Sequence, residues 1–140
     1  WSINPLAAAY FAIFPDQDYD CVIYAYKVTS AIDVTRITPD EYLGVGVLKP
    51  PGITARIARQ GAIFTFHNPA TTRLDENLED QGNLQRIIVK KEYRKEFIYE
   101  LDRYGINRMT LFPDLDGLSE YANWSSMKRT RTYWTGGPVE

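Results

Sequence analysis

The chain has 140 residues, of which 44% are hydrophobic and 24% charged, as in ordinary globular domains. Three Trp, ten Tyr and six Phe exclude intrinsic disorder as a description of the whole chain. A single cysteine and a single histidine exclude a disulfide framework and the usual zinc clusters, which leaves carboxylate sites for magnesium or calcium open. The formal net charge of −2 argues against a nucleic-acid-binding domain that works by bulk attraction.

No segment contains the roughly 20 consecutive apolar residues that a transmembrane helix needs, so we expect no membrane partner and a cytoplasmic location. The opening segment has neither a basic n-region nor a small-residue cleavage site, and it is therefore not typical of a signal peptide. The chain begins at Trp1 and not at a methionine. We interpret this as a sign of processing or of a fragment.

The first predicted element is a helix over residues 2–14. Ser2 or Asn4 can cap it, and Pro5 suits the first helical position because its missing N–H would have no partner there. The spacing predicts one buried face, made of Leu6, Tyr10, Ile13 and Phe14.

Three segments are typical of strands. Residues 21–28 are almost continuously apolar, which predicts a strand covered on both faces. Residues 62–67 and 84–89 are rich in β-branched and aromatic side chains. Between them, residues 53–58 fit either a short helix or a strand.

Two further helices are predicted towards the C-terminus. Over residues 93–104 the apolar positions recur at helical spacing, and Gly105 stands where a helix-ending glycine belongs. A last helix fits residues 114–127, with Leu115, Leu118, Tyr121 and Ala122 facing inward. Residues 128–140 form a tail with a basic start, which we interpret as solvated.

This order of elements predicts an α/β or α+β domain: a mixed sheet of at least three strands flanked by helices. Three strands make a thin core for a chain of this length. We therefore expect the sheet to be incomplete.

Few single residues point to chemistry. Cys21 opens an apolar strand, which favours a buried, inert thiol over a nucleophile. His67 has no acid or nucleophile near it in sequence, so a structural or surface role is favoured over that of a general base. Asp114 and Asp116 follow a proline, which favours helix capping over acid–base work.

The segment before the second strand is less ordinary. Arg56, Arg59 and Gln60 precede a glycine that leads directly into an aromatic strand starting near Phe64. Polar side chains at the entry of a strand are well placed to line a cleft. An ordinary loop with exposed arginines is the alternative interpretation.

Three segments resemble the FRG domain family, which is named for a Phe-Arg-Gly motif. Residues 56–66 read RIARQGAIFTF, residues 1–12 read WSINPLAAAYFA and residues 105–118 read GINRMTLFPDLDGL, in the order that the family has them. The family's naming motif and its Thr-Arg-Leu-Leu-Asp segment normally precede the position of Trp1. The resemblance therefore implies that residues 1–127 are the C-terminal part of such a domain.

The resemblance implies an incomplete ADP-ribosyltransferase-like split sheet, with NAD as substrate and no metal. Ser2 matches the motif that orders the nicotinamide pocket, and Gln60 matches a late position where such transferases carry a glutamate. Arg56 and Arg59 would face the pyrophosphate, and Phe64 is assigned to the same nucleotide site. An amide takes no proton, so Gln60 would position the ribose by hydrogen bonds and not act as a base.

Three functions remain open at this stage. The first is NAD hydrolysis or ADP-ribosyl transfer by the intact domain, in a toxin or phage-defence setting, with this chain alone inactive. The second is a non-catalytic module that binds a ligand or a protein, which Gln60 in place of glutamate favours. A nucleic-acid role resting on Arg56, Arg59 and the basic residues 128–131 is the weakest, because the chain is slightly acidic overall. An exposed sheet edge would favour self-association.

Overall fold

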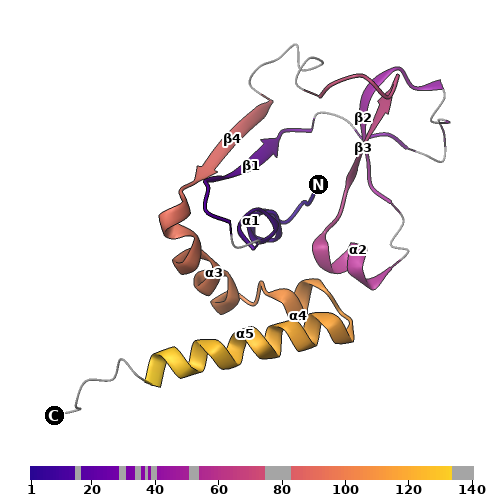
Figure 1. Ribbon diagram of the computed structural model, residues 1–140. Coiled ribbons are helices and arrows are strands. Elements are labelled where there is room, and N and C mark those ends of the chain that lie inside the picture. Colours follow the sequence, from indigo (N-terminus) through magenta and orange to yellow (C-terminus); the bar gives the residue numbers. More distant parts are fainter. Residues whose placement is uncertain are drawn as a thin grey trace.

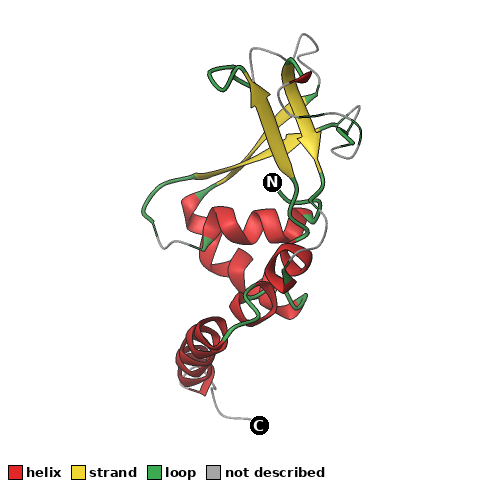
Figure 2. Cartoon of the chain, turned by 90° about the vertical axis from the view of Figure 1, so that its right-hand side faces the viewer, coloured by secondary structure: helices red, strands yellow, loops and turns green. Residues whose placement is uncertain are grey.

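A computed structural model describes residues 1–14, 17–28, 31–33, 36, 38, 41–50, 54–74 and 83–133, with side chains up to residue 127. The described part of the chain is a mixed α/β structure with five α-helices and two small antiparallel sheets. Figure 2 shows the strands gathered at one end of the molecule and the helices at the other. The prediction of an α/β architecture is confirmed at this level.

Helix α1, Pro5–Ile13, lies at the centre of the molecule between β1, α2 and α3 (Figure 1). Its N-cap is Asn4, whose side chain accepts hydrogen bonds from the backbone N–H of Leu6 and Ala7. The buried residues of α1 are Ala7, Ala9, Tyr10 and Ile13. The two alanines are small and let neighbouring elements approach the helix closely. Leu6 is 38% exposed, so its predicted place on the buried face is wrong.

Strand β1, Cys21–Tyr26, pairs antiparallel with β4, Leu84–Val89, in a register that places Cys21 opposite Val89. Both strands were predicted from their composition. Cys21 is buried, as predicted, but Val22 and Tyr24 are exposed. The prediction that this strand is covered on both faces is therefore wrong.

Strand β2, Gly44–Leu48, pairs antiparallel with β3, Phe64–Asn68. A mixed sheet of at least three strands is not confirmed, because the four described strands form two separate antiparallel pairs. Strand β2 was not predicted, because it contains two glycines, which are poor strand formers. Gly46 is required there, since a Cβ at this position would lie only 1.9 Å from the side chain of Ile32.

Residues 53–58 were open to a helix or a strand, and the structure has helix α2, Ala55–Gln60. Thr54 caps its N-terminus, and Gly61 ends it in the left-handed conformation with φ +56°. The glycine reverses the chain directly into β3. The polar side chains of α2 are thereby held beside the start of an aromatic strand.

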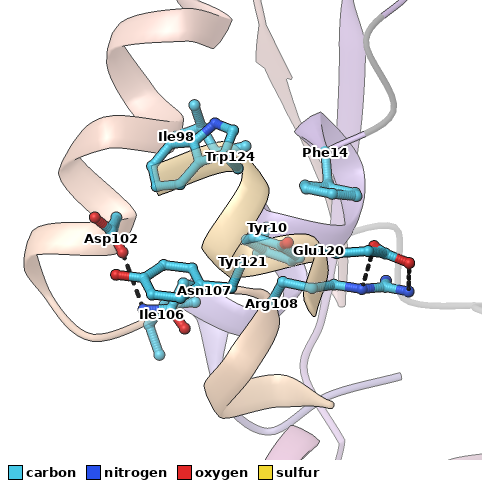
Figure 3. Close-up of a pocket in the computed structure, with 10 residues that line it drawn as sticks. All are labelled: Tyr10, Phe14, Ile98, Asp102, Ile106, Asn107, Arg108, Glu120, Tyr121 and Trp124. Carbon is cyan, nitrogen blue, oxygen red and sulfur yellow. Dashed lines mark hydrogen bonds and ion pairs between the residues drawn. The ribbon is translucent and has the colours of Figure 1, made fainter. Parts of the chain in front are cut away.

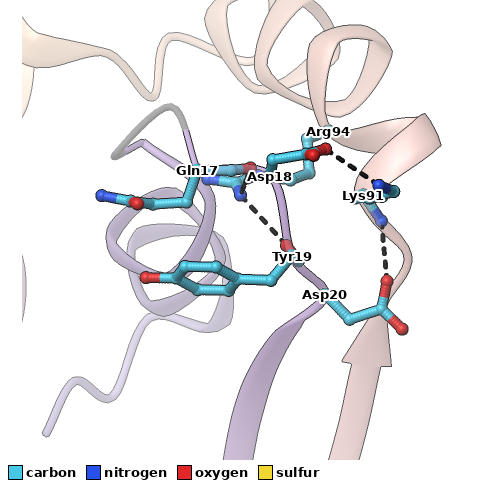
Figure 4. A network of polar contacts seen from close by, with 6 residues as sticks. All are labelled: Gln17, Asp18, Tyr19, Asp20, Lys91 and Arg94. Carbon is cyan, nitrogen blue, oxygen red and sulfur yellow. Dashed lines mark hydrogen bonds and ion pairs between the residues drawn. The ribbon is translucent and has the colours of Figure 1, made fainter.

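Helix α3, Arg94–Arg103, follows a 3-10 helix over Lys91–Tyr93 and ends before Gly105, whose φ is +76°. This confirms the predicted helix and its terminal glycine. Arg94 is buried, and its guanidinium donates to the carbonyl of Ile13 at the end of α1 and to those of Gln17 and Tyr19. These bonds hold Gln17 and Tyr19 against α3 (Figure 4).

Helix α4, Arg108–Leu111, is a short element that the sequence analysis missed, held by a capping box between Asn107 and Thr110. Helix α5, Leu115–Tyr133, extends beyond the predicted end at residue 127. Of its predicted inward face, Tyr121 is partly buried, whereas the prediction is wrong for the other three residues: Leu115 is 82% exposed, and Leu118 and Ala122 are also exposed. The inward side carries Gly117, Tyr121 and Trp124. Gly117 faces the carbonyl of Phe112, where a Cβ would lie only 2.2 Å from the oxygen.

Candidate functional site

An open groove of about 600 Å³ lies between the N-terminal segment, α1, β1 and the turn from α2 into β3. Four of the five residues predicted to form the site line it: Ser2, Arg56, Gln60 and Phe64. Arg59, on the same helix as Arg56 and Gln60, does not line this groove. The predicted catalytic pair and two of the three predicted NAD-contacting residues are thus brought together.

Backbone pairing places Ser2 beside Gln60. The N–H of Ile3 donates to the carbonyl of Gly61 at 2.9 Å, and Ser2 and Ala62 form an isolated antiparallel bridge. The Ser2 hydroxyl donates to the backbone carbonyl of Gln60 at 2.7 Å and accepts from the N–H of Asn4 at 3.0 Å. This hydroxyl therefore holds the N-terminal segment to α2.

The side chain of Gln60 is held by a distant helix. Its Nε2 donates to the backbone carbonyl of Leu111 in α4 at 3.1 Å. Its side-chain oxygen has no hydrogen-bond donor among the described residues and can accept one from a ligand. An amide cannot exchange a proton as a carboxylate does, so Gln60 can position a ligand but cannot act as a general base.

Arg56 is the charged side chain of the groove. Its guanidinium lies over the ring of Phe112, 4.6 Å from the ring centroid. Arg56 forms no ion pair within the described part of the chain, although it also lines a separate pocket of about 300 Å³ with Asp114, Asp116 and Glu120. A cation without a carboxylate partner, at the wall of an open groove, is suited to an anionic group of a ligand.

Exposed aromatic rings supply the apolar surface of the groove. Trp1, Phe11, Tyr24 and Phe64 are each between 41% and 50% exposed, although aromatic side chains of this size are usually well buried. The Trp1 ring is also supported by Tyr26 at a centroid distance of 6.0 Å. Such rings can stack on a planar ligand.

The remaining sequence candidates have structural roles. His67 Nδ1 lies 2.6 Å from the carbonyl oxygen of Thr72, and its Nε2 lies 3.1 Å from the Thr65 hydroxyl, so both ring nitrogens are engaged. Asp114 accepts a hydrogen bond from the N–H of Gly117 at 2.7 Å and caps α5. Asp116 lies in the first turn of that helix, where a carboxylate complements the helix dipole.

A second, much smaller cavity of about 20 Å³ lies between α1, α3 and α5 (Figure 3). Tyr10 lines it and is 2% exposed, and its hydroxyl has no hydrogen-bond partner among the described residues. Burial raises the pKa of Tyr10, an effect that nearby Arg108 opposes and that Glu120 and Asp102 reinforce. This cavity is too small for an organic ligand.

Phe112 and Arg108 do not line the groove, but the Phe112 ring contacts the groove residue Arg56 as well as Arg108, and the sequence analysis gave neither Phe112 nor Arg108 a role. Both belong to residues 105–118, a segment that was noted for its resemblance but given no role. No local pattern shows that an aromatic residue after a short helix meets an arginine of α2. Only the tertiary contact between α2 and α4 reveals it.

Within the described ranges, no three His, Cys, Asp or Glu side chains gather closely enough to hold a metal ion. None of the described helices combines the length and the apolar character needed to cross a lipid bilayer. No family model, curated protein or solved structure significantly matches this chain.

Proposed function

We propose that this chain belongs to the FRG domain family, and that its groove binds NAD in an ADP-ribosyltransferase-like domain that hydrolyses NAD or transfers its ADP-ribose. One observation carries the proposal: residues selected for an NAD site, at positions 2, 56, 60 and 64, line a single groove. Ser2 and Gln60 lie far apart in the sequence and are joined by a hydrogen bond.

The groove offers a partner for each chemical part of NAD. The Arg56 guanidinium suits the pyrophosphate, because it is charged and has no ion-pair partner in the described structure. The rings of Trp1, Tyr24 and Phe64 suit the adenine and nicotinamide planes. The side-chain oxygen of Gln60 can accept a hydrogen bond from a ribose hydroxyl.

A non-catalytic module that binds the same class of ligand is the second candidate. Two observations favour it. None of the described residues that line the groove carries a carboxylate or an imidazole, the usual general bases. In addition, the Ser2 hydroxyl and the Gln60 amide N–H are already bonded to backbone carbonyls. The two candidates therefore share a ligand and differ in turnover.

The decisive experiment compares binding and turnover by the full chain. Calorimetric titration with NAD and with ADP-ribose measures affinity, and release of nicotinamide measures turnover. We expect Arg56→Ala to weaken the binding of both ligands, since it removes a charge-assisted contact worth about tenfold in affinity. Arg59→Ala is the matched control, because Arg59 lies on the same helix outside the groove.

Each outcome separates the candidates. Nicotinamide release that Gln60→Ala abolishes supports an NAD-consuming site. Binding sensitive to Arg56→Ala without any release supports the non-catalytic module. Lack of binding by the folded chain, or equal losses in Arg56→Ala and Arg59→Ala, would contradict NAD recognition in this groove.

A further inference from the structure

Phe112 contacts two cationic side chains at once. Its ring lies at the end of α4 and is 6% exposed. The guanidinium carbon of Arg108 is 3.8 Å from the ring centroid, and that of Arg56 is 4.6 Å from it. The Phe11 ring packs edge to face with the Phe112 ring at a centroid distance of 5.8 Å. Two guanidiniums next to one buried ring form cation–π contacts, and these electrostatic attractions act in addition to the apolar packing of the ring.

Only one of these two arginines, Arg108, has an ion-pair partner in the described part of the chain. Arg108 forms an ion pair with Glu120, with Nε 2.7 Å from one carboxylate oxygen and Nη2 3.2 Å from the other (Figure 3). This pairing reduces the repulsion between the two guanidiniums. Arg56 forms no such pair in the described part of the chain, although Asp114, Asp116 and Glu120 line a pocket of about 300 Å³ with it, and the Phe112 ring lies against its guanidinium.

The backbone also supports this arrangement. Arg56 is an exposed, long side chain on a helix of 6 residues, and without a contact it would sample many rotamers. The hydrogen bond from Gln60 to the carbonyl of Leu111 ties this helix to α4, one residue before Phe112. The ring is therefore held at a fixed place relative to the base of the Arg56 side chain.

We infer that Phe112 is a positioning residue, whose ring face holds the Arg56 guanidinium at the wall of the groove and pre-organises it for the pyrophosphate of the ligand. The inference rests on the proposed function, because it assigns a role in recognising that ligand. It adds a specificity element outside the groove, since Phe112 does not line it. Pre-organisation raises affinity because less conformational entropy is lost on binding.

The test replaces Phe112 in the full chain by phenylalanines carrying one, two and three fluorine atoms. Fluorine withdraws electron density from the ring face with little change in volume, so it weakens the cation–π contact while packing is kept. We expect the affinities for NAD and for inorganic pyrophosphate to fall stepwise, by about twofold to fivefold over the series. The affinity for adenosine, which has no phosphate, stays unchanged.

The same series in an Arg56→Ala chain is the control, and there we expect no dependence on fluorine. Two results would overturn the role of Phe112 and leave NAD binding intact. In the first, the affinity of the chain with Arg56 does not change with the number of fluorine atoms. In the second, the affinity falls equally in the Arg56→Ala chain. Absence of NAD and pyrophosphate binding by the unsubstituted chain would overturn the proposed function as well. Phe112→Leu, if folded, must likewise weaken binding only when Arg56 is present.

Discussion

The side-chain amide of Gln60 and the backbone carbonyl of Leu111 are joined by a 3.1 Å hydrogen bond, although 51 residues separate them. The backbone carbonyl of Gln60 in turn accepts a hydrogen bond from the Ser2 hydroxyl. One residue at the end of α2 thus connects the N-terminal segment, α2 and α4. Of these elements, the N-terminal segment and α2 line the groove, so its shape depends on the contact between Ser2 and Gln60.

Replacing Gln60 should lower the free energy of unfolding. Gln60→Ala removes the hydrogen bond to Leu111, which predicts a loss of about 1 kcal/mol in urea titrations. Gln60→Glu should cost more at neutral pH, because a carboxylate would then face a carbonyl oxygen. Arg59→Ala, an exposed change on the same helix, should have almost no effect. A Gln60→Glu chain as stable as the unmodified one would show that the amide does not bridge the helices.

The buried Arg94 predicts a larger effect. Its guanidinium donates to three backbone carbonyls, those of Ile13, Gln17 and Tyr19. A lysine cannot reproduce this fork, so we expect Arg94→Lys to lower the free energy of unfolding by about 2 to 3 kcal/mol in urea titrations. Lys95→Ala, an exposed substitution one position along the chain, serves as the control. Equal midpoints for the Arg94→Lys and unmodified chains would contradict the anchoring role.

Local signals predicted the elements whose formation depends on local chemistry. Asn4 was one of two predicted caps of α1 and is the one that the structure has, although the predicted helix began at residue 2 and α1 begins at Pro5. The end of α3 follows from Gly105, since a left-handed glycine acts within one turn. The apolar composition of β1 and β4 also sufficed to find them. Their pairing with each other depends on residues far apart in the sequence and was not predicted.

The buried face of α5 and the contacts of the candidate site depend on tertiary contacts, which local sequence patterns do not show. The inward face of α5 passes through Gly117 because the carbonyl of Phe112 lies there, and no periodicity of apolar residues encodes this. The candidate site shows the same division. Resemblance placed Ser2 and Gln60 in one groove, whereas the contact between Arg56 and Phe112 joins two segments whose sequences give no sign of each other.

Acid should remove a contribution of Asp20 to stability. Asp20 accepts hydrogen bonds from the Lys90 ammonium at 2.7 Å and from the backbone N–H of Lys91, and these lower its pKa below the usual 3.8. Because the folded-state pKa is the lower one, the stabilisation is present above about pH 4 and is lost as the pH falls through the folded-state value.

Asp20→Asn should therefore be less stable than the unmodified chain at pH 7, and the difference should shrink towards pH 2. Urea titrations at these pH values measure it. Asp18→Asn is the matched control, because Asp18 pairs with Lys91 while its side chain remains 95% exposed, and it should change stability little. A difference for Asp20→Asn that is constant with pH would exclude an ionised Asp20 as its source.

Removing the hydroxyl of Tyr10 should stabilise the fold. This hydroxyl is buried without a partner among the described residues, so Tyr10→Phe predicts a gain of about 1 kcal/mol at pH 7. Burial raises the pKa of Tyr10 above its usual 10.0, so the unfolded chain ionises first and stability falls above pH 10. Denaturation curves for Tyr10→Phe should therefore show a smaller alkaline loss, which the exposed control Tyr19→Phe should not reproduce. Destabilisation by Tyr10→Phe at pH 7 would instead reveal that the hydroxyl is hydrogen-bonded in solution.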